Sequence, residues 1–299
     1  MRKRLITGIV LAIILIPLIV FERMRAVFEV MMAVFVVISA IELIRMYEKK
    51  KKFGLLPSIG IVFSTLLMFF SLSGAFGWFD NNDDPPMVFN ILRITIPLIT
   101  LIIFSSLVFF KNFNGEDIGK ALTIVNYVGI GYASLVSLRF LGVRFIVFLL
   151  IISSATDVFA YLFGVKFGKH KMAPMISPKK SWEGAIAGTV IATILASCFA
   201  LFYGDLFPAG STLNTTGVQT LLDGFSFLVD NRVLQVIFII PITVFASIIG
   251  QLGDLFASKL KRTYEIKDFG TILPGHGGIL DRFDSALFVA MFLTAVFVV

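Results

Sequence analysis

The chain has 299 residues, of which 58% are hydrophobic, with 33 phenylalanines and a mean hydropathy of +0.95. So much apolar surface cannot be enclosed in a water-soluble globule, so the composition excludes an ordinary soluble enzyme and predicts a polytopic membrane protein. The net charge of +7 is divided among loops, which excludes a basic domain large enough to grip a nucleic acid. We expect an all-α integral membrane protein built as a single membrane domain, residues 1–299.

Nine apolar stretches approach the roughly 20 residues that a helix needs to cross about 30 Å of hydrocarbon. In chain order they are Leu5–Val20, Ala26–Ile44, Leu55–Gly77, Val88–Phe110, Gly119–Leu138, Phe145–Gly164, Gly184–Leu206, Val233–Ala257 and Asp284–Val299. About nine transmembrane helices are therefore predicted. The loops within 5–44 and 119–164 are short, which leaves a count of eight or ten open.

Lysine and arginine remain on the cytoplasmic side of a membrane and indicate the orientation. With the N-terminus inside, 20 of the 26 basic residues, including every lysine, fall in cytoplasmic loops. The acidic segment 80–84 and the Ser/Thr/Asn-rich segment 208–232 then face outward. We predict a cytoplasmic N-terminus, an external C-terminus and a multi-pass location in the cell (inner or cytoplasmic) membrane.

The two halves of the chain differ in the charge that their apolar stretches carry. Residues 1–138 are expected to be N-terminal scaffold spans, with Lys49–Lys52 in contact with anionic lipid head groups. Residues 139–299 are expected to form the catalytic half. Its first intramembrane charge is Asp157, four residues before Tyr161. A carboxylate at this depth is expected to face the bundle interior and meet a cation.

The segment 177–184 reads Ser-Pro-Lys-Lys-Ser-Trp-Glu-Gly. Lys179 and Lys180 can bind phosphate, Trp182 suits the membrane interface, and Glu183 opens a helix. These features indicate a substrate or lipid head-group site on the cytoplasmic side. They fit equally well a membrane-edge loop that is capped by Ser181 or Glu183.

Carboxylates gather near the end of the chain. Asp254 closes an otherwise uncharged run from Val233, and eleven of the 27 residues in 258–284 are ionisable. Asp281 and Asp284 are three residues apart, which places both on one face of a helix that begins near Gly278. Such hard oxygen ligands suit Mg²⁺ that bridges substrate phosphates. Each aspartate alone is equally compatible with a helix cap or an ion-pair partner.

A glycine-rich segment, 275–278, lies between these charges. Its backbone can approach a ligand closely, and amides at the start of the following helix favour phosphate. His276 stands between glycines, which favours contact with a ligand over packing. Five basic residues in this region could neutralise a triphosphate, although membrane anchoring explains some of them. They are Lys259, Lys261, Arg262, Lys267 and Arg282.

Residues 258–284 resemble the signature of the phosphatidate cytidylyltransferases, the CDP-diacylglycerol synthases. The matching positions are Ser258, Lys261, Arg262, Lys267, Asp268, Gly270, Leu273, Pro274, His276, Gly277, Gly278, Asp281, Arg282 and Asp284. The upstream segments 157–164 and 177–184 also resemble this family. The N-terminal half matches only as generic membrane spans.

The resemblance implies Mg²⁺-dependent transfer of a cytidylyl group from CTP to phosphatidic acid, which gives CDP-diacylglycerol and pyrophosphate in phospholipid biosynthesis. On this basis Asp254 and Asp281 are the expected metal ligands, Asp284 and Asp268 are additional ligands, and there is room for a second cation. His276 would steady the departing pyrophosphate. The residues expected to contact the substrates are Asp157, Lys179, Lys180, Trp182, Glu183, Ser258, Lys259, Lys261, Arg262, Lys267, Gly277, Gly278 and Arg282.

Two other functions are compatible with parts of the pattern. A CTP-dependent kinase of a polyprenol-type lipid would also need basic phosphate loops and Mg²⁺ carboxylates. An ion-coupled transporter would use Asp157 and Asp254 as coupling residues, but the charges gather at one membrane face and paired broken helices in matching halves are not evident. Small-residue helix faces permit a homodimer without requiring one.

Overall fold

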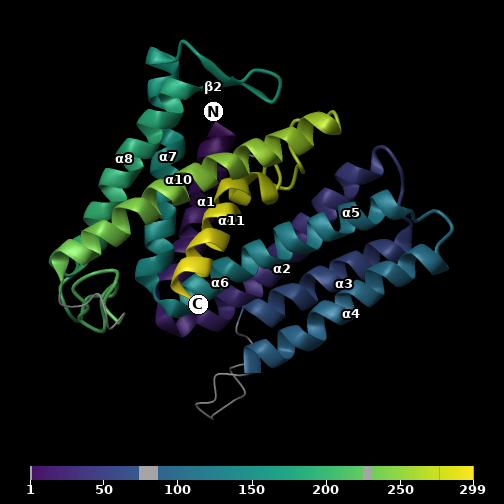
Figure 1. Cartoon of the computed structure of the whole chain (residues 1–299), viewed down its shortest axis with the longest axis horizontal. Coiled ribbons are helices and arrows are strands. Elements are labelled where there is room, and N and C mark those ends of the chain that lie inside the picture. Colours follow the sequence, from purple (N-terminus) through teal and green to yellow (C-terminus); the bar gives the residue numbers. More distant parts are fainter. Residues whose placement is uncertain (1, 74–86, 225–230, 276, 299) are drawn as a thin grey trace. The chain divides into compact units, whose positions relative to one another are not determined.

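A computed structural model describes residues 2–73, 87–224, 231–275 and 277–298, and these are mostly helical (Figure 1). This confirms the expected helical membrane protein, with one small sheet in addition. The elements in chain order are α1 (Arg2–Val20), η1 (Glu22–Met24), α2 (Arg25–Glu48), α3 (Leu55–Leu72), α4 (Met87–Phe109), α5 (Gly115–Ile124), the π-helical η3 (Val125–Ile130), α6 (Gly131–Leu141), α7 (Val143–Phe167), β1 (Lys171–Ala173), β2 (Ser177–Ser181), α8 (Trp182–Leu201), α9 (Tyr203–Leu206), α10 (Arg232–Thr263) and α11 (Leu280–Phe297).

Helices occur in all nine predicted apolar stretches, but fewer of them qualify as membrane spans. Within the described residues, six helices are long and apolar enough to cross a membrane. They are Glu22–Glu48, Leu55–Leu72, Gly115–Leu141, Val143–Phe167, Trp182–Leu201 and Arg232–Thr263. In the described part, α1 and α4 provide shorter apolar helices, Thr7–Val20 and Ile94–Phe109. Helix α11 carries three charges in its first turns, at positions 281, 282 and 284. The structure therefore supports six spans rather than establishing nine.

The chain forms two compact units. The first unit contains Met1–Leu18, Arg23–Ser137 and Leu260–Phe283, and the second contains Ile19–Glu22, Leu138–Lys259 and Asp284–Val299. Helices α10 and α11 contribute residues to both. Most of the charged segment 258–284 therefore belongs to the same unit as the N-terminal helices.

In the first unit, α2 turns one apolar face inward. Met32, Val36, Ala40 and Leu43 are fully or almost fully buried, and their spacing of three to four residues matches the helical repeat. Helix α3 packs against α2, α4 and η3. The start of α11 packs on the same core, because the Phe283 ring lies 5.7 Å from that of Phe35 and 5.4 Å from that of Tyr132.

In the second unit, α7 and α8 pack together with their backbones close, as neighbouring helices in Figure 1. A side chain at Gly184 would place its Cβ 2.5 Å from the carbonyl oxygen of Ala160, and one at Gly188 would lie 2.7 Å from that of Thr156. Glycines spaced four residues apart allow such close approach in membranes. The contact fixes Asp157 of α7 next to the first turns of α8.

Hydroxyl and amide side chains link α7, α8 and α10 within the second unit. Ser247 of α10 is hydrogen-bonded to Thr156 at 2.8 Å and donates to Thr189 at 3.1 Å, and the Gln251 amide donates to Thr189 at 2.8 Å. Polar groups that bond one another avoid exposure to hydrocarbon. These bonds hold α10 in register beside the other two helices.

The small sheet corrects one prediction. Strands β1 and β2 form an antiparallel hairpin in which Lys171 pairs with Ser181 and Ala173 with Ser177. The expected fold was all-α, and strands of three and five residues are too short to show the alternating pattern that would have predicted this hairpin. Pro178 is tolerated at such a sheet edge, where an N–H is not needed for pairing. The hairpin places Lys179 and Lys180 immediately before α8.

Candidate active site

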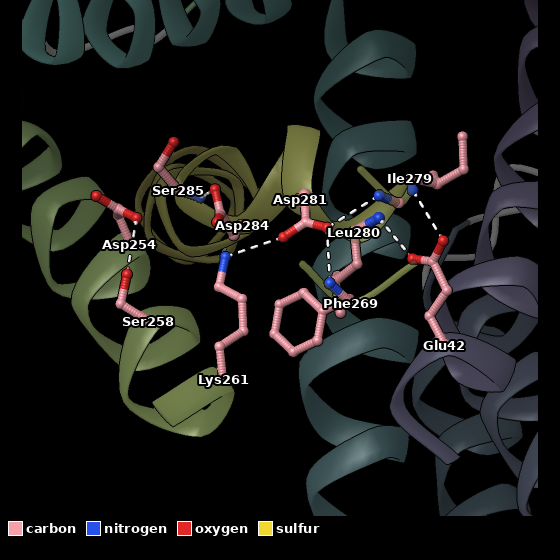
Figure 2. Close-up of polar contacts among 11 residues, drawn as sticks. Glu42, Asp254, Ser258, Lys261, Phe269, Ile279, Leu280, Asp281, Asp284 and Ser285 are labelled. Carbon is pink, nitrogen blue, oxygen red and sulfur yellow. Dashed lines mark hydrogen bonds and ion pairs between the residues drawn. The ribbon is translucent and has the colours of Figure 1, made fainter. Parts of the chain in front are cut away.

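Asp281 organises the loop between α10 and α11, residues 264–279, which we call the signature loop. One of its oxygens pairs with Lys261 Nζ at 2.9 Å, and the other accepts hydrogen bonds from the backbone N–H of Phe269 at 2.8 Å and Gly278 at 2.9 Å (Figure 2). The Asp281 side chain is only 3% exposed. The carboxylate thus joins the end of α10, the middle of the loop and the start of α11.

A second carboxylate at the same place comes from the N-terminal half. Glu42 of α2 accepts hydrogen bonds from the backbone N–H of Ile279 and Leu280, each at 3.0 Å, and is 2% exposed (Figure 2). No functional residue was predicted in this half. The available signal was an acidic residue inside the apolar stretch 26–44, which is costly in a membrane unless it has a partner.

These bonds change the expected role of the helix start. The sequence analysis expected the amides at the start of the last helix to bind phosphate. In the structure the N–H groups of Gly278, Ile279 and Leu280 donate to Asp281 and Glu42. The protein supplies its own negative charge at the positive end of the helix dipole, so these amides are already satisfied.

The signature loop encloses a cavity of about 580 Å³ within the first unit. The structure brings four of the predicted site residues to this cavity: Lys267, Asp268, Gly277 and Arg282. Gly270, Thr271, Leu273 and Gly275 complete its lining. Two cations, one carboxylate and a glycine-rich wall suit an anionic ligand with its own counter-ion. His276 lies outside the described residues.

A smaller cavity, of about 220 Å³, lies within the second unit. Asp157, Lys179, Lys180 and Asp254 all line it, so four further predicted residues meet at one place. Lys180 Nζ lies 2.5 Å from an Asp254 oxygen, and both side chains are partly exposed, by 24% and 30%. Asp157, the carboxylate that was expected to meet a cation, lies in the same cavity as Lys179 and Lys180, but the ion pair formed there joins Lys180 to Asp254.

Hydroxyl groups complete the polar surroundings of this cavity. Ser258 donates to Asp254 at 3.4 Å (Figure 2). Ser285 donates to Asp157 at 3.4 Å. Asp284 accepts from the backbone N–H of Ser285 at 2.9 Å. Hydroxyl partners at these distances form weak bonds, so both carboxylates can exchange them for a ligand.

Beside the polar cavity runs an apolar groove of about 270 Å³, which we call the α8/α10 groove. Trp182, Ile186, Val190, Ile248 and Leu252 line it. Ala185 and Gln251 line both the groove and the polar cavity. A polar site that continues into an apolar groove suits an amphipathic ligand.

The remaining predicted residues have local roles in the structure. Glu183 accepts from the His170 backbone N–H at 3.1 Å and lies 2.7 Å from its ring nitrogen, which closes the base of the hairpin. Ser181 is the N-cap of α8 and accepts from the Gly184 N–H at 3.3 Å. This is the capping arrangement that the sequence analysis left open. Lys259 and Arg262 lie exposed on α10.

A divalent cation needs several oxygen ligands around it. Within the described residues, no group of three or more His, Cys, Asp and Glu side chains could hold a metal ion. Asp157 and Asp254 nevertheless face one cavity, and Mg²⁺ needs only one or two carboxylates when substrate phosphates and water complete its shell. The second-unit cavity therefore fits Mg²⁺ together with a phosphate ligand. Asp281 has hydrogen-bond partners on both oxygens.

The sequence is similar to proteins of one known family. The sequence profile of the Cytidylyltransferase family matches residues 2–299, so the chain belongs to this family. It is 33% identical over 297 residues to the phosphatidate cytidylyltransferase of Bacillus subtilis, covering 98% of this chain and 96% of that protein. It is 37% identical over 203 residues to the enzyme of the same name from Staphylococcus haemolyticus, covering 68% of each chain.

Proposed function

We propose that this protein transfers the cytidylyl group of CTP to phosphatidic acid, giving CDP-diacylglycerol and pyrophosphate. The match that carries the proposal is the 33% identity to a phosphatidate cytidylyltransferase across 98% of the chain, together with the family match over residues 2–299. The two cavities support it, because one suits a soluble anion and the other an amphipathic ligand.

The signature-loop cavity is the proposed site of the CTP phosphates. Lys267 and Arg282 line it, and a guanidinium can bind phosphate oxygens in a bidentate manner. Because the amides of residues 278–280 are bonded to carboxylates, side-chain cations rather than a helix terminus would hold the phosphates. Lys261 and Arg262 at the end of α10 add positive charge to the same unit.

The second-unit cavity is the proposed site of the lipid phosphate. Lys179 and Lys180 line it, and the α8/α10 groove would take one acyl chain. The groove contains Trp182, which is 52% exposed, as expected of an amphipathic ring at the membrane interface. Burial of apolar chain then adds about 0.8 kcal/mol per methylene group to the binding of the lipid.

Asp254 is the proposed ligand of Mg²⁺, with Asp157 facing the same cavity. The metal would supply positive charge that offsets the charge developing on the phosphates. Lys180 now neutralises Asp254 and would turn to the lipid phosphate when Asp254 takes a cation. Asp281, Asp284 and Asp268 remain proposed as further metal ligands, with room for a second cation, and Asp254→Asn and Asp281→Asn variants distinguish the role of Asp254 from that of Asp281.

The reaction places modest demands on acid–base chemistry. A phosphate oxygen of phosphatidic acid attacks the α-phosphorus of CTP, a phosphorus–oxygen bond forms, and the bond to the β-phosphate breaks to release pyrophosphate. A phosphate oxygen is already anionic and nucleophilic, so the residues of the two cavities need only position the reactants and neutralise charge. His276 is proposed to steady the leaving pyrophosphate.

We further propose the finer membrane arrangement: nine spans, a cytoplasmic N-terminus, an active site on the cytoplasmic side, and a place in the cell (inner or cytoplasmic) membrane. The distribution of lysine supports this orientation, and CTP is a cytoplasmic metabolite. A homodimer is compatible with the small-residue helix faces.

The test of the proposed function is pyrophosphate release by purified protein in mixed micelles. We expect release only when CTP, phosphatidic acid and Mg²⁺ are all present, with CDP-diacylglycerol formed in equal amount. Release of CDP instead, with a lipid alcohol as acceptor, would contradict the proposal and favour a CTP-dependent lipid kinase. Protein heated until it loses its helical circular dichroism is the matched control.

A further inference from the structure

Glu42 differs from the other acidic residues of α2 in its hydrogen-bond partners. Its two oxygens accept from two consecutive backbone N–H groups, those of Ile279 and Leu280, both at 3.0 Å. These groups lie more than two hundred residues later in the chain, at the first turn of α11. Hydrogen bonds from N–H to a carboxylate are about twice as strong as neutral ones, and the helix dipole adds to them.

The glycines of the signature loop fit around this carboxylate. A Cβ at Gly270 or at Gly278 would overlap Oε1 of Glu42. Neither glycine has the positive φ that would by itself require glycine, whereas Gly275 and Gly277 do, with φ of 77° and 88°. Gly270 and Gly278 are therefore required by the presence of Glu42 rather than by their own backbone conformation.

The contact reaches the proposed CTP site directly. Gly270 lines the signature-loop cavity on one side and abuts Glu42 on the other. Asp281 fastens the same loop through the N–H groups of Phe269 and Gly278. Glu42 thus stands immediately behind the cavity wall, whereas Asp281 fastens that wall from the helix that follows.

We infer that Glu42 is a positioning residue: it sets the conformation of the signature loop, and through Gly270 and Gly278 it sets the shape of the cavity that would bind the phosphates of CTP. The inference deepens the proposed function and rests on it for the identity of the ligand. It assigns to the N-terminal half a part in forming the cavity, in addition to its part in the membrane-embedded scaffold.

The chain offers a matched control for Glu42. Glu29 lies in the same helix, is 7% exposed against 2% for Glu42, and accepts from the Ser73 hydroxyl at 2.7 Å. A Glu29→Gln variant therefore changes a comparably buried carboxylate of α2 without touching the signature loop. A loss of general stability should be common to both variants, while a change in the loop should be confined to Glu42→Gln.

Glu42→Gln replaces one acceptor oxygen by an NH₂ group, which faces a backbone N–H and cannot accept from it. In hydrogen–deuterium exchange of the unliganded protein in detergent, we expect the amides of residues 277–283 to exchange about 10-fold faster. Glu29→Gln should leave them unchanged. In the enzyme assay we expect the KM for CTP to rise about 10-fold while the KM for phosphatidic acid stays within about twofold.

A second variant covers the case in which Glu42→Gln does not fold. Gly270→Ala presses a methyl group against Glu42 and should speed exchange at the same helix start. Gly115→Ala, whose new Cβ would meet nothing within 4 Å, is its control. The inference is overturned if loop exchange in the Glu42 and Gly270 variants equals that in their controls, or if the CTP and lipid KM values rise together.

The two arms of the experiment separate this inference from the proposed function. The exchange measurement uses no substrate, so it tests the contact between Glu42 and the loop even in a protein that fails to turn over CTP. Absence of CTP turnover in the wild-type protein would refute the proposed function. Unchanged exchange in an active protein would refute the role of Glu42.

Discussion

The two units hold their carboxylates in contrasting ways. Asp281 and Glu42 of the first unit accept mainly from backbone N–H groups and are nearly inaccessible, at 3% and 2% exposure. Asp254 of the second unit is paired with a lysine and a serine side chain and is 30% exposed. Backbone partners are fixed by the fold, whereas side-chain partners can rotate away. The comparison indicates that the first pair shapes a cavity and that Asp254 is available to a ligand.

The largest expected effect follows from Asp254→Asn. We expect kcat to fall about 1,000-fold, because the variant removes the negative charge that would hold the proposed Mg²⁺ beside the substrate phosphates. The melting temperature in detergent should change little, since a partly exposed ion pair contributes little to stability. Pyrophosphate release and a thermal melt of the same preparation measure both. A kcat within about tenfold of the wild type would show that Asp254 is not the metal ligand.

Asp281→Asn should combine loss of activity with loss of stability. The asparagine cannot keep an ion pair with Lys261 and still accept two N–H bonds, and Lys261 is only 12% exposed. We expect the free energy of unfolding to fall by about 3 kcal/mol. Urea unfolding followed by circular dichroism would measure it. If Asp281→Asn were as stable as Asp254→Asn but inactive, Asp281 would not serve mainly to shape the cavity, and it would be assigned as a direct metal ligand.

Much of the fold could be predicted from the sequence, because hydrophobic length alone indicates membrane helices. Each of the nine predicted stretches contains a helix, and residues such as Lys267 and Arg282 do line one cavity. The number of true spans could not be fixed in this way. Helix α11 begins with charges, and α1 and α4 contribute shorter apolar segments, so length and composition are not decisive for them.

The partners of individual side chains could not be predicted, because they come from distant parts of the chain. Glu42 and Leu280 are 238 residues apart, and one sequence does not indicate that they meet. The hydrogen bonds from Ile279 and Leu280 to Glu42 were not predicted for this reason. The ion pair between Lys180 and Asp254 also joins two segments that the sequence analysis treated separately.

A smaller effect should distinguish the ligands of the two cavities. Lys267 lines the first cavity and Lys179 the second, and both side chains are exposed. We expect Lys267→Gln to raise the KM for CTP about 10-fold and Lys179→Gln to raise that for phosphatidic acid by a similar factor. Initial rates with each substrate varied in turn would show it. Equal shifts for both substrates in either variant would contradict the assignment of one ligand to each cavity.

The smallest effect concerns the apolar continuation of the second cavity. Trp182 and Phe167 are each 52% exposed, but only Trp182 lines the α8/α10 groove. Trp182→Ala should raise the KM for a long-chain phosphatidic acid about threefold, because apolar contact is lost, and should leave that for a dioctanoyl lipid nearly unchanged. Phe167→Ala is the control. The acyl chains of the dioctanoyl lipid are too short to reach along the groove. A rise in KM for both lipids would therefore mean that Trp182 acts on the lipid head group through the hairpin. The α8/α10 groove would then not be the site of the acyl chain.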